Sequence, residues 1–236
     1  MSTQHTTAAR CLALVPCAGI GTRAGAGLPK QYAAVGGQPM VAHTLAALQR
    51  VPQLAEVMVV LAPDDTRFEA AVPGFTGPRC RIARCGGATR AETVANGLAV
   101  LAGQGAGADD WVLVHDAARC LLQPAWVERL IEACRDDAVG GLLALPLADT
   151  LKQAQDGRVE ATLARDGKWA AQTPQMFRLG LLRDALARAG AGVTDEAGAV
   201  EALGLAPRLV PGDPENFKLT LPADFALAER LWRTRA

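Results

Sequence analysis

The segment LVPCAGIGTRAGAGLPKQY, residues 14–32, decides the fold because it joins an apolar strand to a glycine-rich turn. Gly19 and Gly21 follow the strand, and glycines in that place let a backbone approach a phosphate closely. Two cations, Arg23 and Lys30, come after them. The segment therefore predicts an anion-binding loop at the carboxyl end of the first strand.

The rest of the chain repeats the step from strand to helix. Short apolar runs occur at 11–16, 57–62, 79–84, 111–115 and 141–146, and helical spacing occurs at 40–50, 89–101 and 124–134. This alternation predicts an α/β protein with a mostly parallel sheet and helices on both faces. Ligands of such sheets bind at the carboxyl ends of strands, next to a topological switch. We therefore expect the loops after Val15 and Val114 to share one edge.

The pattern changes between about residues 147 and 172. This stretch is polar, alternates in places and contains Asp156-Gly157, a strong signal for a hairpin turn. It has too few apolar residues for a core position, so we expect a β-hairpin arm that projects from a single domain spanning residues 1–236. A second subunit is the usual cover for the unpaired edges of such an arm.

The last third of the chain is predicted to return to helices and strands. Helical patterns occur at 179–189 and at 195–203, the second with Thr194 as its N-cap. The end of the chain reads as a strand, a loop, a second strand within NFKLTL (216–221), and a helix with Pro222 near its start.

Composition excludes several classes of function. The 24 basic and 24 acidic residues cancel, so the chain has no broad field for nucleic acid or anionic lipid. Six cysteines form no CxxC pair, which argues against a zinc site and favours a reducing compartment, the cytoplasm. No apolar run is long enough to cross a membrane, and the amino terminus does not resemble a cleaved leader.

The glycine-rich turn alone permits two interpretations. Residues 19–24 match G-x-G-x-x-A, the dinucleotide turn of an NAD(P)-dependent dehydrogenase. The strand at 57–61 leads into Ala62-Pro63, however, and not into the acidic residue that a ribose requires. Arg23 and Lys30 instead suit a triphosphate or a departing pyrophosphate. The alternative without a ligand is an ordinary turn in which both cations are solvated.

Two further motifs follow predicted strands. In VLVHDAAR (112–119), Asp116 ends a buried strand beside the first loop and is a candidate to hold Mg²⁺, while Arg119 could bind a second anionic substrate. The alternative is that Asp116 only caps a turn and His115 is a core histidine. In CGGATRAETV (85–94), Gly86 permits close approach of a base and Thr93 offers a hydroxyl, although a plain helix start explains the same residues.

Taken together, PCAGIGTR, LPKQY, GGATRAETV, VHDAAR, DTLK, RDGKWAAQTPQMF, TDEA and NFKLTLPAD resemble the 2-C-methyl-D-erythritol 4-phosphate cytidylyltransferases of the non-mevalonate isoprenoid pathway. The resemblance is collinear from about Leu12 to Glu229. It implies a Rossmann-like nucleotidyltransferase fold, a homodimer joined by the arm, Mg²⁺, and transfer of CMP from CTP to methylerythritol phosphate.

The resemblance also implies roles for matching positions. Arg23 and Lys30 are expected to stabilise charge on the α-phosphate and the leaving pyrophosphate, and Arg165 and Lys218 to position the acceptor. The nucleotide-binding positions that the resemblance implies are Cys17, Ala18, Gly19, Gly21, Gly86, Thr93, Asp116 and Ala117, and Asp116 is also expected to serve the metal. Arg119, Thr150 and Thr173 complete the acceptor pocket, with Thr150 and Arg165 reaching across the dimer.

Three departures and three alternatives accompany the resemblance. Ala88 stands where many members have an acid, Thr93 replaces a usual Ser, and Cys120 replaces a usual Pro. The nearest alternative is a ribitol-5-phosphate cytidylyltransferase or another sugar-phosphate nucleotidyltransferase, since every nucleoside triphosphate presents the same phosphates to the first loop. The dehydrogenase and a catalytically silent binding protein are the other two.

Overall fold

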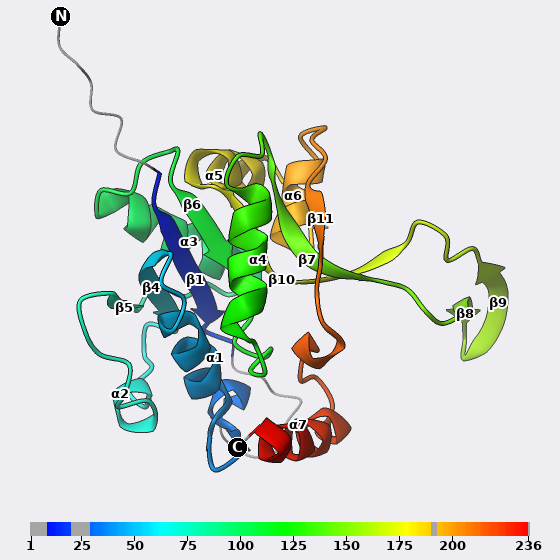
Figure 1. Cartoon of the computed structure of the whole chain (residues 1–236), viewed down its shortest axis with the longest axis horizontal. Helices are drawn as coiled ribbons and strands as arrows, with labels where there is room; N and C mark the ends of the chain where they lie inside the picture. Colours follow the sequence, from blue (N-terminus) through cyan, green and yellow to red (C-terminus); the bar gives the residue numbers. More distant parts are fainter. Residues whose placement is uncertain (1–8, 20–28, 190–192, 236) are drawn as a thin grey trace, which may run out of the picture.

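A central sheet of seven strands organises the chain (Figure 1). The computed structural model describes residues 9–19, 29–189 and 193–235. In these residues the strand order is β11-β7-β10-β6-β1-β4-β5. The strands are β1 (Cys11–Cys17), β4 (Leu54–Leu61), β5 (Cys80–Ala83), β6 (Trp111–Val114), β7 (Gly140–Pro146), β10 (Trp169–Arg178) and β11 (Arg208–Pro211).

The sheet is mostly parallel, as predicted. β1 pairs in parallel with β4 and β6, β4 with β5, and β11 with β7. Within the described sheet only β10 runs antiparallel to its neighbours, β6 and β7. The central strands are buried on both faces, which explains their unbroken runs of Val, Leu and Met.

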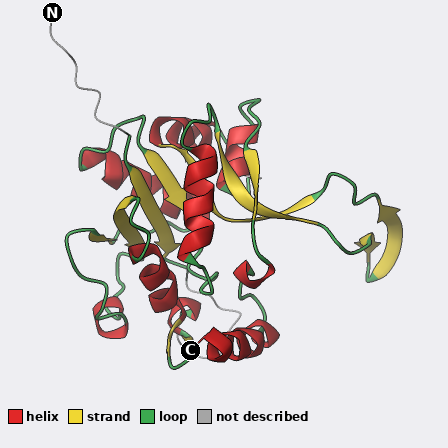
Figure 2. Ribbon diagram, viewed as in Figure 1, coloured by secondary structure: helices red, strands yellow, loops and turns green. Residues whose placement is uncertain are grey.

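Helices cover both faces of the sheet (Figure 2). α1 (Met40–Gln49) and α4 (Pro124–Cys134) pack in the core cluster on one face, and α3 (Arg90–Gly103), α5 (Leu179–Arg188) and α6 (Glu196–Glu201) pack in the cluster on the other. Smaller elements are η2 (Lys30–Tyr32), β2 (Ala34–Val35), β3 (Gln38–Pro39), α2 (Phe68–Ala71), η3 (Pro214–Asn216) and α7 (Pro222–Arg235). This is the predicted Rossmann-like arrangement, and among the described helices none is long and apolar enough to span a membrane.

The topological switch lies between β1 and β6. From β1 the chain builds outward to β4 and β5 on one side, and it then returns to place β6 on the other side of β1. The registers Leu14↔Val114 and Cys17↔Leu61 bring the carboxyl ends of these strands to one edge. The ends of β1 and β6 therefore lie at the same edge, as expected, and this is the edge at which ligands of such sheets bind.

A long β-hairpin arm projects from the body of the molecule (Figure 1). β7 and β10 extend into it, and its tip is the antiparallel pair of β8 (Leu151–Gln155) and β9 (Arg158–Leu163). Asp156 and Gly157 form its turn with φ of 50° and 75°, a left-handed conformation that Asp-Gly tolerates. The apolar side chain of Val159 at the tip is 64% exposed, so a single chain leaves it in contact with solvent.

Two local expectations were wrong. Asp195, not Thr194, is the N-cap of α6, because its Oδ1 accepts a hydrogen bond from Gly198 N at 3.0 Å. No strand forms at 217–221 among the described residues; Leu219 is buried and its N donates to Ala118 O at 2.9 Å. The side chain of Leu219 packs in a hydrophobic cluster with Met40 and Leu121, so its strand-like alternation with neighbouring residues misleads.

Replacement of Gly97 tests how tightly α3 packs on the sheet. A β-carbon at Gly97 would lie 2.7 Å from Leu14 Cδ1 and 2.8 Å from Val60 Cγ2, inside the core. We expect Gly97→Val to lower the free energy of unfolding by about 1–3 kcal/mol through overpacking, measured by urea denaturation. Gly103→Val is the matched control in the same helix, because no atom lies within 4 Å of a β-carbon there. Equal stability of the two variants would contradict the packing.

Candidate active site

A pocket of about 260 Å³ opens at the edge where β1 and β6 end. Its described lining comes from five segments: 16–19 after β1, Lys30 and Gln31 of η2, 87–90 at the start of α3, 116–118 after β6, and Lys218. Met40 and Thr93 complete it. The pocket thus gathers segments up to 202 positions apart onto the switch point.

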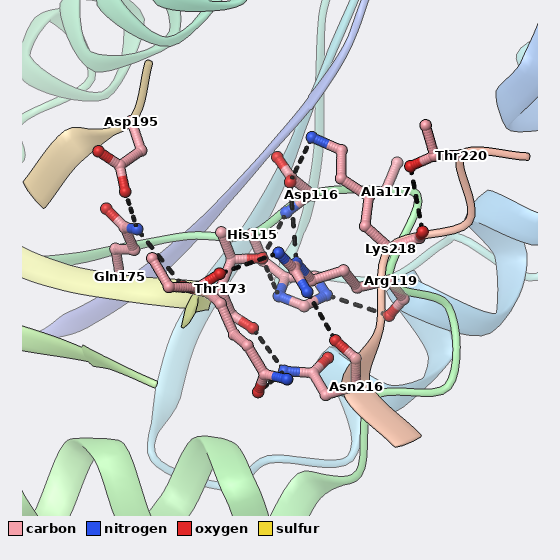
Figure 3. A network of polar contacts seen from close by, with 12 residues as sticks. His115, Asp116, Ala117, Arg119, Thr173, Gln175, Asp195, Asn216, Lys218 and Thr220 are labelled. Atoms are coloured by element: carbon pink, nitrogen blue, oxygen red, sulfur yellow. Dashed lines mark hydrogen bonds and ion pairs between the residues drawn. The ribbon is translucent and has the colours of Figure 1, made fainter. Parts of the chain in front are cut away.

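Asp116 is the one carboxylate among the described lining residues, and cations surround it (Figure 3). Arg90 Nε donates to its Oδ1 at 2.8 Å, and Lys218 Nζ lies 2.9 Å from its Oδ2. Burial opposes ionisation, but Arg90 and Lys218 outweigh burial and hold the pKa of Asp116 well below its usual value. Asp116 is therefore charged, and it keeps the cations together at the pocket.

Thr173 and His115 fix the start of the Asp116 loop. The Thr173 hydroxyl accepts a hydrogen bond from Asp116 N at 3.0 Å and lies 3.1 Å from His115 Nδ1. Burial lowers the pKa of His115 to about 4, so the ring is neutral. His115 Nε2 lies 3.3 Å from Arg119 O, which can only accept. The consistent assignment has the proton on Nε2 and Thr173 donating to Nδ1.

Arg119 lies on the other side of Asp116. Its Nη1 donates to Asn216 O at 2.7 Å, and Asn216 Nδ2 donates to Thr173 O at 2.8 Å (Figure 3). Arg119 Nε is 3.9 Å from Asp116 Oδ2 and has no hydrogen-bond acceptor among the described residues. This buried N–H is a donor that an incoming anion could satisfy.

Residues 216–219 form a strap that joins the cations. Lys218 reaches Asp116, and the carbonyl of Leu219 accepts a hydrogen bond from Lys30 Nζ. Leu219 N in turn donates to Ala118 O, which attaches the strap to the loop after β6. The strap therefore brings Lys30 and Lys218 to the same edge, although they are 188 positions apart.

Most of the expected nucleotide-binding residues that the structure describes line the pocket, but Gly86 does not. Cys17, Ala18, Gly19, Thr93 and Ala117 line the pocket with Asp116. Gly87 also lines the pocket, whereas Gly86 is absent from the described lining. Gly86 instead packs tightly against Ala18: a β-carbon added at Gly86 would lie 2.2 Å from Ala18 Cβ. The Thr93 hydroxyl accepts from Gly87 N at 3.1 Å and donates to Thr89 O at 2.9 Å, so it orders the glycine turn.

Two predicted residues, Thr150 and Arg165, lie apart from the pocket. Thr150 and Arg165 are exposed on the arm, where Arg165 donates to Ala148 O. Arg23 and Gly21 fall outside the described residues. One chain therefore brings together Lys30, Asp116, Arg119, Thr173 and Lys218, and the two arm residues are not brought to them.

Sequence reasoning missed Arg90, Glu196 and Asn216. Arg90 was visible in the motif GGATR but read as a helix residue, and Glu196 sits within TDEA without an assigned role. Arg90 and Glu196 are paired although they are 106 positions apart in the sequence, and no local sequence pattern reveals such a pair. The available signal was the charge of Arg90 and Glu196, each in a segment predicted to begin a helix; Asn216 offered no such signal.

The donor set fits Mg²⁺ that is held mainly by a nucleotide. Among the described residues there is no cluster of three or more His, Cys, Asp or Glu side chains suitable for a metal. Mg²⁺ in nucleotide sites commonly takes one or two carboxylates and completes its shell with phosphate oxygens and water. Asp116 supplies one such carboxylate.

The described pocket has no activated protein nucleophile. Burial raises the pKa of the Cys17 thiol far above neutrality, so the thiolate is not populated. His115 is neutral but completely buried, and its ring nitrogens face Thr173 and Arg119 O. The site therefore suits a reaction whose nucleophile arrives already ionised on a substrate.

Comparison with known proteins identifies the family of this chain. A family model described as 2-C-methyl-D-erythritol 4-phosphate cytidylyltransferase matches residues 11–234. The 2-C-methyl-D-erythritol 4-phosphate cytidylyltransferase of Paraburkholderia phymatum is 54% identical over 228 residues, covering 94% of this chain and 96% of the relative. The bifunctional enzyme IspD/IspF of Albidiferax ferrireducens is 59% identical over 233 residues, which are 99% of this chain but only 55% of that relative.

Solved structures give the same result. A crystal structure of 4-diphosphocytidyl-2C-methyl-D-erythritol synthase superposes with a TM-score of 0.85 and 44% identity, covering 95% of this chain and 98% of the other. Because the family model spans nearly the whole chain and full-length relatives exceed half identity, the assignment does not depend on the fused enzyme. This chain belongs to the 2-C-methyl-D-erythritol 4-phosphate cytidylyltransferase family.

Proposed function

We propose that the pocket beside Asp116 is where this cytidylyltransferase transfers CMP from CTP to 2-C-methyl-D-erythritol 4-phosphate. The products are 4-diphosphocytidyl-2-C-methyl-D-erythritol and pyrophosphate, and the reaction belongs to isoprenoid precursor synthesis. The observation that carries the location is the group of cations at the switch point: Lys30, Arg90, Arg119 and Lys218. In a chain of zero net charge, such a local excess suits two phosphorylated substrates.

The chemistry explains why cations matter more than a base. The acceptor is a phosphate monoester with a second pKa of roughly 6, so it is mostly a dianion at neutral pH and needs no deprotonation. It must approach the α-phosphorus of an anionic triphosphate. Two unit charges about 4 Å apart repel by roughly 4 kcal/mol at an effective dielectric constant of 20. Fixed cations and in-line alignment therefore supply most of the catalysis.

We assign the residues on the β1 side to the nucleotide. The segment Cys17–Gly19 presents its backbone to the pocket, and Lys30 lies beside it. Lys30, with Arg23 of the same loop, would stabilise the α-phosphate and the leaving pyrophosphate. Gly87 is a better candidate than Gly86 for close contact with the base, since Gly87 lines the pocket. Ala88 also lines it, so no acidic side chain at that position contacts the nucleotide.

We assign the residues on the strap side to the acceptor. Lys218 and the unsatisfied Nε–H of Arg119 would bind the phosphate of the acceptor. Thr173 holds the loop that carries Asp116, because its hydroxyl accepts a hydrogen bond from Asp116 N. Thr150 and Arg165 are on the projecting arm, so we propose that the arm of a second copy brings them to this pocket. The active form is then a homodimer joined through the arm.

Mg²⁺ is the divalent ion that we propose for this site, held by Asp116 together with substrate phosphates. When bound, it neutralises charge on the phosphate oxygens. Asp116 must then share its carboxylate between the metal and the cations that now surround it. All six cysteines are free thiols in the structure, which supports a reducing compartment, and we propose the cytoplasm.

A nucleotide panel tests the activity itself. Purified protein with Mg²⁺ and methylerythritol phosphate is mixed with CTP, UTP, GTP or ATP, and pyrophosphate release is measured. We expect release with CTP at a kcat/KM at least about tenfold above the other three, a difference of about 1.4 kcal/mol in transition-state binding. Ribitol 5-phosphate serves as the acceptor control. Faster turnover of ribitol 5-phosphate, or of another triphosphate, would overturn the assigned reaction.

Lys30→Ala tests the role of the first loop. Because Lys30 is assigned to charge that develops in the transition state, we expect kcat to fall by about 10²-fold or more while the KM for CTP changes less. Arg81→Ala is the control, since Arg81 of β5 pairs with Glu56 of β4 at 3.5 Å and neither residue lines the pocket. Steady-state kinetics with an unchanged kcat in Lys30→Ala would remove this residue from the reaction.

Mixed dimers test whether the arm acts across subunits. We expect Arg165→Ala and Lys30→Ala each to be nearly inactive alone. If the arm serves the neighbour, a mixed dimer has one site that carries both defects and one intact site. Mixing the two variants after reversible dissociation should then restore activity toward the share of intact sites. No recovery, with subunit exchange confirmed by differently tagged chains, would place Arg165 in the site of its own chain.

A further inference from the structure

Arg90 lies between two carboxylates at the rear of the pocket. It is the first residue of α3, and its Nε donates to Asp116 Oδ1 at 2.8 Å. Its Nη1 and Nη2 donate to Glu196 Oε1 and Oε2 at 2.7 Å and 3.0 Å. All three guanidinium nitrogens are therefore directed to carboxylate oxygens, and the contact with Glu196 has the two-pronged geometry that an Arg makes best.

Glu196 is a buried support and not a lining residue of this pocket. Its side chain is 1% exposed, and it is missing from the described lining. It begins α6, which is fixed to the sheet because Gln175 of β10 accepts from Ala197 N and donates to Asp195, both at 2.7 Å. The carboxylate behind Arg90 is thus attached to a rigid strand, and it holds Arg90 from the side opposite to Asp116.

The two cations nearest Asp116 differ in how they are held. Arg90 has three charge-assisted hydrogen bonds, and its side chain is 28% exposed. Lys218 is paired with Asp116 at 2.9 Å, its side chain is 45% exposed, and it lies in residues 217–220, which have no regular secondary structure. A phosphate that enters the pocket can therefore attract Lys218 more easily than Arg90.

We propose that Arg90 is a positioning residue: Glu196 holds it in place, and it fixes the orientation of the Asp116 carboxylate while Lys218 transfers its contact from Asp116 to a substrate phosphate. The inference rests on the proposed function of this pocket. In this proposal Arg90 stays bound to the Asp116 carboxylate, whereas Lys218 leaves the carboxylate and binds a substrate phosphate. Arg90 would act through Asp116, and Glu196 would act through Arg90.

Variants of Arg90 test the geometric part of the proposal. We expect Arg90→Ala to lower kcat by about 10²-fold, the cost of a misplaced reacting group, and to leave the KM for methylerythritol phosphate within about threefold. Arg90→Lys restores a positive charge but not the fork that joins two carboxylates. We therefore expect Arg90→Lys to recover less than a tenth of the wild-type kcat. Recovery of the full kcat would show that only charge is needed and overturn the proposal.

Variants of Glu196 separate positioning from folding. Glu196→Gln keeps one acceptor oxygen for Arg90 and removes the charge, so we expect a tenfold loss of kcat. In Arg90→Ala, Glu196 remains as a buried unpaired carboxylate, which lowers the midpoint of thermal unfolding. Adding Glu196→Gln to Arg90→Ala should raise that midpoint again while kcat stays at the level of Arg90→Ala. A further loss of kcat in the double variant would show that Glu196 has a role independent of Arg90.

Arg10→Ala is the control for loss of an arginine–carboxylate pair outside the pocket; the side chain of Arg10 is 47% exposed and that of Asp110 is 10% exposed. Arg10 binds Asp110 at 2.6 Å, just before the start of β6, whereas Arg90 binds Asp116 just after its end. We expect Arg10→Ala to lower the unfolding midpoint and to leave kcat unchanged. If Arg10→Ala and Arg90→Ala lower kcat equally, the effect on the reaction comes from general destabilisation, and the proposal fails.

Direct binding adds a readout that does not depend on turnover. Calorimetric titration with CTP in the absence of metal should give a weaker affinity for Arg90→Ala than for the wild type, and Glu196→Gln should lie between them. Wild-type protein without CMP transfer would refute the proposed function. An active wild type whose Arg90→Ala variant keeps both kcat and CTP affinity would refute only the positioning role.

Discussion

The ionised carboxylate of Asp116 is the constraint on which the site depends. A buried charge is costly unless it is paired, and Asp116 is paired on both oxygens, by Arg90 at 2.8 Å and by Lys218 at 2.9 Å. The same carboxylate lets the cations Arg90, Arg119 and Lys218 lie close together, since their mutual repulsion would otherwise separate them. Phosphate oxygens can then take over contacts that Asp116 now makes.

The fold serves this arrangement by bringing distant segments to one edge. β1 and β6 end side by side at the switch point, so Cys17–Gly19 line the same pocket as Asp116. The strap 216–219 then crosses the same edge and delivers Lys218. The two ends of β6 differ: Asp110 before the strand is bound by Arg10, and Asp116 after it faces the pocket.

The fold was largely predictable because apolar runs and helical spacing are local signals. Asp116 could be identified since it directly follows a buried strand, and the Asp156-Gly157 turn identified the arm. Glu196 could not, because its partner Arg90 is 106 positions away and a buried glutamate has no local signature. The strand predicted within 216–221 failed for a related reason: Leu219 alternates like a strand residue but is buried against the loop after β6.

A crystal structure of the protein with CTP tests the central claim most directly. The account predicts that the triphosphate lies between the loop after β1 and the Asp116 cluster, with Lys30 in contact with phosphate oxygens. It also predicts that Arg90 remains on Asp116 and Glu196 in that complex. A triphosphate directed away from the loop after β1, with the Asp116 cations unchanged and facing only solvent, would contradict it.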